Sequence, residues 1–198
     1  MRNSTRHLNV RYMTMTAMLS AVAFVLMFLD FKVPFMPSFI SMDFSELPAL
    51  IGAFAMGPWY GAIICLVKNL LHLLITTTGG VGELSNFILG SAFVMPAGLL
   101  YQHKKSKKNA IVGSILGAVF MALLSIASNY FIVYPVYTAF MPMDTIINMY
   151  KEIYSGADTL LKCLVIFNMP FTFVKGMCSV GITLLVYKHI SPIIKGNY

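Results

Sequence analysis

The stretch from Ala110 to Tyr134 reads AIVGSILGAVFMALLSIASNYFIVY and contains no acidic or basic side chain. A helix of roughly 20 consecutive apolar residues crosses the hydrocarbon core of a bilayer. This stretch is therefore long enough to span a membrane without help from its neighbours. It predicts a membrane-spanning helix and sets the fold class that we expect for the whole chain.

The composition of the chain agrees with that class. Of its 198 residues, 58% are hydrophobic and only 11% are charged, and the mean hydropathy is +0.78. Soluble domains carry about 25% charged residues. We therefore expect an all-α integral membrane bundle that forms a single domain over residues 1–198, with no room for a second, soluble domain.

Six hydrophobic segments are separated by polar or proline- and glycine-containing breaks. We expect spans at residues 8–29, 45–56, 59–77, 81–101, 110–134 and 160–187. The second is short for a full crossing and is expected to tilt or lean on its neighbours. Pro135 is expected to end the fifth span, and Pro170 to kink the sixth. The more polar stretch from Met141 to Thr159 predicts a loop with a short surface helix.

The basic residues are distributed unevenly between the two sides of this arrangement. With the N-terminus inside, nine lie on the inner side, namely Arg2, Arg6, Arg11, Lys104, Lys105, Lys107, Lys108, Lys188 and Lys195. The outer loops hold only Lys32 and Lys151, with Lys162 close to that side. This positive-inside bias predicts a multi-pass membrane protein with both termini cytoplasmic. Because the positive charges sit at segment ends, the formal charge of +7 does not indicate nucleic-acid binding.

Polar side chains inside spans are costly and usually face a cavity or one another. The spans contain Lys68, Asn69, His72, Glu83, Asn86, Asn129, Asn168, Thr172 and Lys175. We expect Glu83, Asn129, Asn168 and Thr172 to converge on a pocket that opens outward, with Lys175 near its floor. Lys175 is the strongest candidate because no carboxylate in its own span lies within one turn of it.

Structural roles compete with binding at several of these positions. Lys68 could pair with a carboxylate such as Glu83 and so join spans three and four. His72 and Asn86 fit hydrogen bonds between helices. Pairs of small residues four apart, Ala17 with Ala21 and Gly113 with Gly117, allow another helix to approach closely, and most such pairs pack within their own bundle.

Several motifs are absent from the sequence. It has neither a GxxxxGK[ST] phosphate loop nor HExxH or GxSxG, and its three cysteines lack metal-ligand spacing. The chain is therefore not expected to hydrolyse ATP, to bind a metal or to be an enzyme.

Five stretches carry a resemblance to a known family. They are MDFSELPAL (42–50), KNLLH (68–72), TTGGVGELSNF (77–87), NYF (129–131) leading to Pro135 and Tyr137, and PFTFVKG (170–176). The chain resembles, from about Tyr12 to Tyr187, the riboflavin-specific substrate-binding (S) subunit of energy-coupling-factor (ECF) vitamin transporters.

The resemblance implies a six-helix bundle with an outward pocket for riboflavin as transported substrate, and no cofactor. In it, Asn129, Asn168 and Lys175 become hydrogen-bonding residues, and Phe39 and Met42 become a cover for the flavin ring. From the positions of their polar side chains in the spans, we add Glu83, Asn86 and Thr172 to the expected substrate-binding residues. Thr172 departs from the family, which often has Asn there. The implied partners are membrane lipid, a transmembrane coupling protein docked at Ala17 and Ala21, and two ATPase subunits.

Two alternatives stay open. The same architecture suits another vitamin, such as thiamine or pantothenate. An intramembrane enzyme would instead use His72 and Glu83 as an acid/base pair.

Overall fold

The computed structural model describes residues 2–37, 40–76, 79–139 and 141–195, with the side chains of residues 10–187 within those ranges. The elements in chain order are α1 (Arg2–Met27), β1 (Phe31–Lys32), β2 (Ser41–Met42), α2 (Glu46–Ala55), α3 (Pro58–His72), η1 (Leu73–Ile75), α4 (Val81–His103), α5 (Lys107–Ser128), η2 (Asn129–Val133), α6 (Tyr134–Tyr137), α7 (Met143–Lys151), α8 (Leu160–Cys163), η3 (Leu164–Asn168) and α9 (Met169–Lys195). The all-α class is confirmed, apart from a small antiparallel hairpin in which Phe31 pairs with Met42.

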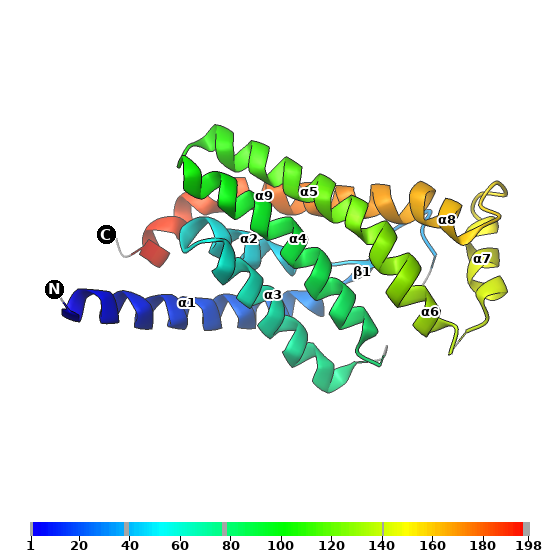
Figure 1. Cartoon of the computed structure of the whole chain (residues 1–198), viewed down its shortest axis with the longest axis horizontal. Coiled ribbons are helices and arrows are strands. Elements are labelled where there is room, and N and C mark those ends of the chain that lie inside the picture. The colour runs from blue at the N-terminus through cyan, green and yellow to red at the C-terminus, as the bar shows by residue number, and fades with distance from the viewer. Residues whose placement is uncertain (1, 38–39, 77–78, 140, 196–198) are drawn as a thin grey trace.

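Five helical stretches among the described residues are long and apolar enough to cross a membrane. They cover Val10–Met27, Pro58–Ile75, Val81–His103, Lys107–Tyr137 and Leu160–Tyr187. The second expected span corresponds to α2, which has only 10 residues. At 1.5 Å per residue it extends about 15 Å, half of a bilayer core. Nine of its residues are buried, so its neighbours in the bundle shield it from lipid. The hairpin segment and α2 together lead the chain back along the bundle, from the end of α1 to the start of α3 (Figure 1).

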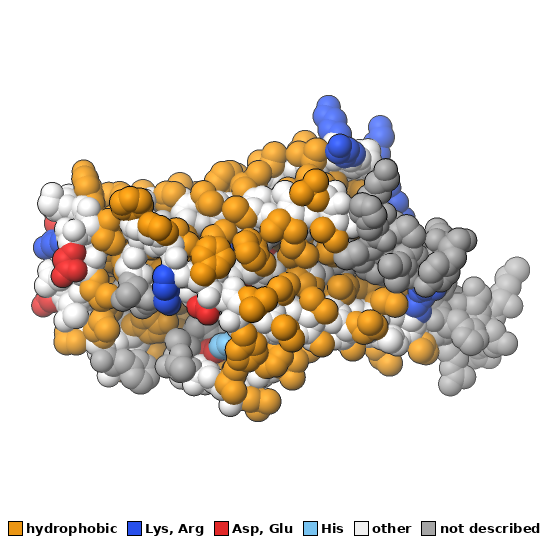
Figure 2. All heavy atoms as spheres, turned by 180° about the vertical axis from the view of Figure 1, so that it is seen from behind, with side chains coloured by type: hydrophobic (Ala, Val, Ile, Leu, Met, Phe, Trp, Pro, Cys, Tyr) orange, Lys and Arg blue, Asp and Glu red, His pale blue; other side chains and the backbone are white. Residues whose placement is uncertain are grey.

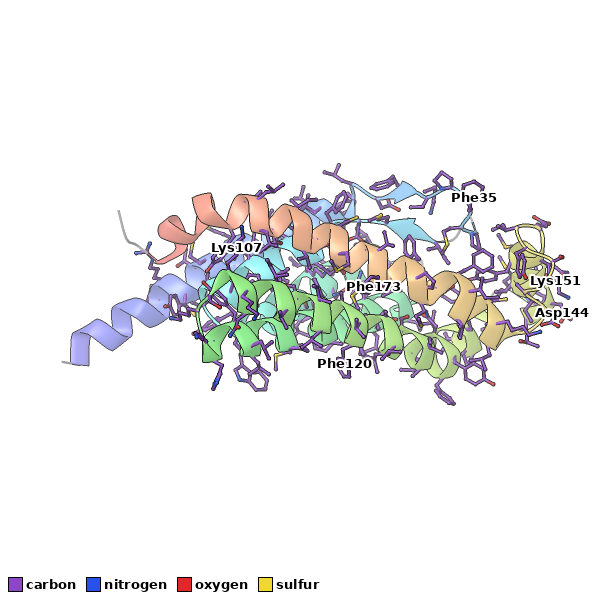
Figure 3. The ribbon with its side chains drawn as sticks, turned by 90° about the horizontal axis from the view of Figure 1, so that it is seen from above. Phe35, Lys107, Phe120, Asp144, Lys151 and Phe173 are labelled. Atoms are coloured by element: carbon purple, nitrogen blue, oxygen red, sulfur yellow. The ribbon has the colours of Figure 1, made fainter. Side chains whose placement is uncertain are left out.

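The start of α1 and the end of α9 lie at the same end of the molecule, and α7 lies at the opposite end (Figure 1). In the space-filling view a largely apolar surface occupies the middle, with most of the visible Lys and Arg side chains toward one end and the acidic side chains toward the other half (Figure 2). Figure 3 shows Lys107 near the end that carries the termini, whereas Asp144 and Lys151 of α7 lie at the other end. An apolar surface bounded by charged ends is the arrangement that a lipid bilayer requires.

Close packing of α4 against α5 accounts for the Gly113 and Gly117 pair. A Cβ atom at Gly113 would come within 3.0 Å of the Ala97 carbonyl oxygen, and one at Gly117 would clash with the carbonyl oxygen of Phe93. This GxxxG motif therefore packs within the chain's own bundle and is not exposed for a partner.

Prolines inside the last two spans are accommodated by π-helical turns, so the prediction that Pro135 ends the fifth span is wrong. Pro135 follows η2 and Pro170 follows η3, each two residues beyond the end of a π-helical segment. A proline has no N–H and its ring clashes with the carbonyl four residues earlier. A π-helical turn changes this hydrogen-bond register, and the fifth helical stretch continues to Tyr137.

Candidate substrate-binding site

A cavity of about 590 Å³ lies between the hairpin and the helices. This volume is within the range of small-molecule sites, about 300–1,000 Å³. The lining residues are Met27, Phe28, Asp30, Lys32, Ile40, Ser41, Asp43, Glu46, His72, Ile75, Gly82, Glu83, Ser85, Asn86, Leu89, Met121, Asn129, Val133, Tyr134, Tyr137, Asn168, Phe171, Thr172 and Lys175. Polar and charged side chains outnumber apolar ones in this lining, so the cavity suits a small organic ligand that has both an apolar body and several hydrogen-bonding groups.

Six of the side chains expected at a pocket line this cavity. They are Glu83, Asn86, Asn129, Asn168, Thr172 and Lys175. Met42 is buried but is not among the lining residues, whereas its neighbours Ser41 and Asp43 are. Successive side chains of a strand point to opposite faces, which explains why Met42 is turned away. Phe39 lies outside the described residues.

A buried cluster of four charged residues forms the floor of the cavity. Lys175 Nζ lies 2.8 Å from Asp43 Oδ2 and 3.3 Å from Glu46 Oε2. Glu46 Oε1 in turn lies 3.3 Å from Lys68 Nζ, which also donates to Ser45 Oγ at 2.5 Å. The two ammonium groups and two carboxylates cancel in charge, and buried ions are tolerated only when paired in this way.

The pairing of Lys68 with Glu83, considered from the sequence, is wrong. Lys68 binds Glu46 instead, and Glu83 Oε1 lies 2.7 Å from His72 Nδ1. The contact between His72 and Glu83 joins α3 to α4, which agrees with the expected interhelical role of His72. Both side chains of this pair also line the cavity.

Asp43 precedes α2 and is outside the long helical spans. Burial alone would raise the pKa of its carboxyl, but the charges of Lys175 and Lys68 and hydrogen bonds from Lys175 and Ser45 outweigh that effect and hold the pKa well below 3.8. Asp43 is therefore ionised throughout the neutral range and keeps Lys175 paired.

Asn168 belongs to a second polar group near the end of the bundle that carries α7. Its Oδ1 accepts from the Tyr150 hydroxyl at 2.7 Å, and its Nδ2 donates to the Tyr134 hydroxyl at 3.3 Å. The two tyrosine hydroxyls are 2.5 Å apart. Tyr150 comes from α7, so this group ties that short helix to the last two spans.

The π-helical segments carry two of the expected asparagines, since Asn129 is the first residue of η2 and Asn168 the last of η3. Both line the cavity. The structure does not show the interhelical hydrogen bond considered for the Asn86 oxygen, because this buried Oδ1 has no hydrogen-bond partner among the described residues. An acceptor left without a partner at a cavity wall suits a ligand N–H group.

Sequence reasoning missed Asp43 and Glu46, because Asp43 precedes the expected span 45–56 and Glu46 lies at its very start, where a charged side chain does not stand out as one inside a span. A signal was present. Lys68 and Lys175 lie in apolar stretches, and buried lysines require counter-ions. The stretch MDFSELPAL supplies two carboxylates, Asp43 and Glu46, for which we expect no other cationic partner.

The expected docking site for the coupling protein lies on the side of α1 that faces away from the bundle. Ala17 and Ala21 are both exposed, and Met13, Met18, Val22 and Val25 of the same helix are exposed as well, at 50–69%. An exposed apolar helix face of this kind contacts either lipid tails or another membrane helix.

Comparison with known proteins identifies the family to which this architecture belongs. A family model described as "ECF transporter, substrate-specific component" matches residues 11–187. The chain belongs to this family. As an ECF substrate-specific component it is a multi-pass protein of the cell membrane and a transport protein, not an enzyme.

Relatives and a solved structure agree with the family. The riboflavin transporter RibU of Staphylococcus aureus (strain TCH60) is 34% identical over 98% of this chain and 98% of its own length. The riboflavin transporter FmnP of Bacillus subtilis (strain 168) is 31% identical over 93% of this chain and 94% of its own length. The ECF component also matches a solved structure described as "Structure and mechanism of the S component of a bacterial ECF transporter", with a TM-score of 0.74 and 33% identity over 94% of this chain and 99% of that one.

Proposed function

We propose that this chain binds riboflavin in the cavity above the Lys175 cluster and delivers it for uptake by an ATP-driven ECF transporter. The relatives named riboflavin transporters match nearly the full length of the chain. Riboflavin has a flat, largely apolar ring with polar edges, carries a polyhydroxyl tail and has no net charge at neutral pH.

The neutralised charge cluster at the cavity floor is the observation that carries this proposal. Lys175 faces the cavity, but Asp43 and Glu46 already balance its charge. The ammonium has three N–H donors, and these two carboxylates leave one for a ligand. An uncharged ligand with hydrogen-bond acceptors at its edge suits this floor, and the asparagines supply further polar contacts.

The energy for transport comes from other subunits in this proposal. The sequence has no phosphate loop, so a coupling transmembrane protein and two ATPase subunits supply the hydrolysis. The exposed Ala17 and Ala21 face docks on the coupling protein. We place both termini in the cytoplasm, since the lysine-rich turn between α4 and α5 lies near the same end as the termini.

Fluorescence titration of riboflavin with the detergent-purified protein tests the proposal. The wild type is expected to quench flavin fluorescence saturably at one-to-one stoichiometry, and Lys175→Ala to bind more weakly. Lys162→Ala is the matched control, because that lysine is 54% exposed and lies outside the cavity lining. Thiamine and pantothenate are titrated in parallel by calorimetry.

Absence of quenching in folded, flavin-free protein refutes riboflavin as the ligand, and binding of thiamine or pantothenate then identifies a different vitamin. If Lys175→Ala binds riboflavin as tightly as the wild type, riboflavin remains the proposed substrate and Lys175 has only a structural role at the cavity floor.

A further inference from the structure

Tyr150 is completely buried although it belongs to α7, a short helix outside the membrane-spanning stretches. Its exposed fraction is 0%, and its ring packs against Phe167 with centroids 5.3 Å apart. Tyr150 does not line the cavity, whereas both residues that its hydroxyl contacts, Tyr134 and Asn168, do. The hydroxyl therefore lies directly behind the cavity wall.

The three side chains form a closed ring of hydrogen bonds. Tyr150 donates its single hydroxyl proton to Asn168 Oδ1, and Asn168 Nδ2 donates to the Tyr134 oxygen. The contact between the two hydroxyls then runs from Tyr134 to Tyr150, because the Tyr150 proton is already used. Each group donates once and accepts once, and such rings polarise cooperatively in a low dielectric.

The hydrogen bonds of this ring show which way the amide of Asn168 faces. An asparagine amide can present either its oxygen or its NH₂ group, and its surroundings select between them. In the structure the Tyr150 hydroxyl donates to Oδ1 and Nδ2 donates to Tyr134, so the amide oxygen faces Tyr150. Burial also raises the pKa of the Tyr150 hydroxyl, which keeps that proton in place at alkaline pH. One amide hydrogen of Asn168 is bound to Tyr134, and the other has no acceptor among the described residues.

We propose that Tyr150 is a positioning residue for ligand binding: through Asn168 it holds a single amide N–H toward the cavity, so the ligand atom at this position is a hydrogen-bond acceptor. The inference rests on the proposed function, because riboflavin, with carbonyl oxygens on its ring and hydroxyls on its tail, is the ligand concerned. It extends the site to a residue that touches no ligand and comes from the outer helix.

Riboflavin titrations on a double-mutant cycle test this role. Tyr150→Phe keeps the ring packing and removes only the hydroxyl, so the amide can turn its oxygen toward the ligand. We expect about tenfold weaker binding, the effect of one hydrogen bond. In the Asn168→Ala background the same change should alter the Kd by less than about twofold, since the group through which Tyr150 acts is gone.

Two further variants separate positioning from simple support of the fold. Tyr154→Phe is the matched control, because Tyr154 follows α7 and is 53% exposed, and it should bind like the wild type. Asn168→Asp retains an acceptor for Tyr150 but has no N–H donor, so it should lose as much affinity as Asn168→Ala. If Tyr150→Phe does not fold, the comparison of Asn168→Asp with the wild type carries the test, because it removes the amide donor and leaves Tyr150 in place.

An equal loss from Tyr150→Phe in both backgrounds overturns the inference, because Tyr150 would then act through α7 packing. Wild-type affinity in Tyr150→Phe or in Asn168→Asp overturns it as well. A failure of the proposed function looks different. In that case the wild type does not bind riboflavin at all, and both the proposed function and the role of Tyr150 are refuted.

Discussion

Lys175 Nζ on α9 lies 2.8 Å from Asp43 Oδ2, across 132 positions of sequence. This ion pair joins the last membrane-spanning helix to the segment between the hairpin and α2. Glu46 extends it to Lys68 of α3, so three helices and the hairpin segment meet at one electrically neutral floor. The pairing explains how a short α2 is held in place and why a buried lysine is tolerated at the floor of the cavity.

Removing Lys175 is expected to destabilise the fold as well as the site. Lys175→Met leaves the Asp43 carboxylate buried without its closest cation, and breaking a buried pair in this way costs about 3–5 kcal/mol. The apparent melting temperature of the detergent-solubilised protein should fall. The double variant Lys175→Met/Asp43→Asn should recover part of the loss, because no uncompensated charge is then left at Asp43.

Lys162→Met is the control for that series. Its partner Asp158 lies 2.7 Å away at the surface, and both side chains are more than half exposed. Exposed pairs of this kind contribute little, so the melting temperature should stay unchanged. A Lys175→Met protein as stable as the wild type would contradict the structural role of the cluster.

The depressed pKa of Asp43 predicts how its contribution depends on pH. A carboxyl whose folded-state pKa lies below its unfolded value of 3.8 stabilises the fold fully above that value and loses the contribution as the pH falls further. The melting-temperature difference between wild type and Asp43→Asn should therefore be constant from pH 7 to about pH 5 and shrink below pH 3.8. A difference that already shrinks between pH 7 and pH 5 would show that Asp43 is not held in its ionised form.

The contact between α4 and α5 predicts opposite outcomes for two glycines. Gly117→Ala places a methyl group against the Phe93 carbonyl, which forces the helices apart at a cost of about 1–3 kcal/mol. A Cβ atom at Gly181 of α9 meets nothing within 4 Å, so Gly181→Ala should be neutral or slightly stabilising because alanine favours helix. Thermal melts of both variants check this, and equal stability would contradict the close packing.

The exposed alanines of α1 should separate binding from transport. Ala17→Trp and Ala21→Trp add bulk on a face that the bundle leaves uncovered, so riboflavin affinity of the isolated protein should not change. Uptake of labelled riboflavin by cells or vesicles that contain the whole transporter should be lost. Leu123→Trp is the control, since Leu123 is 55% exposed on α5. Normal uptake by both alanine variants would place the docking face elsewhere.

Much of the fold could be predicted from hydropathy, because a bilayer imposes a minimum length on each apolar helix. The expected boundaries of 81–101 and 160–187 agree closely with α4 and with the stretch Leu160–Tyr187. The hairpin was missed because its strands have two residues each. The continuation of the fifth helix through Pro135 was missed because it depends on a π-helical turn that hydropathy does not indicate.

The membrane class, the approximate spans and, through the motifs, the family and six of the cavity residues all follow from the amino-acid sequence. Which charges pair depends instead on how the helices pack in the folded bundle. Lys68 with Glu46, Lys175 with Asp43, and His72 with Glu83 are contacts between separate elements. Helical periodicity places side chains on a face of their own helix, but packing fixes which faces meet. The role that we propose for Tyr150 behind Asn168 has the same origin, because no local pattern relates a loop helix to the back of a cavity wall.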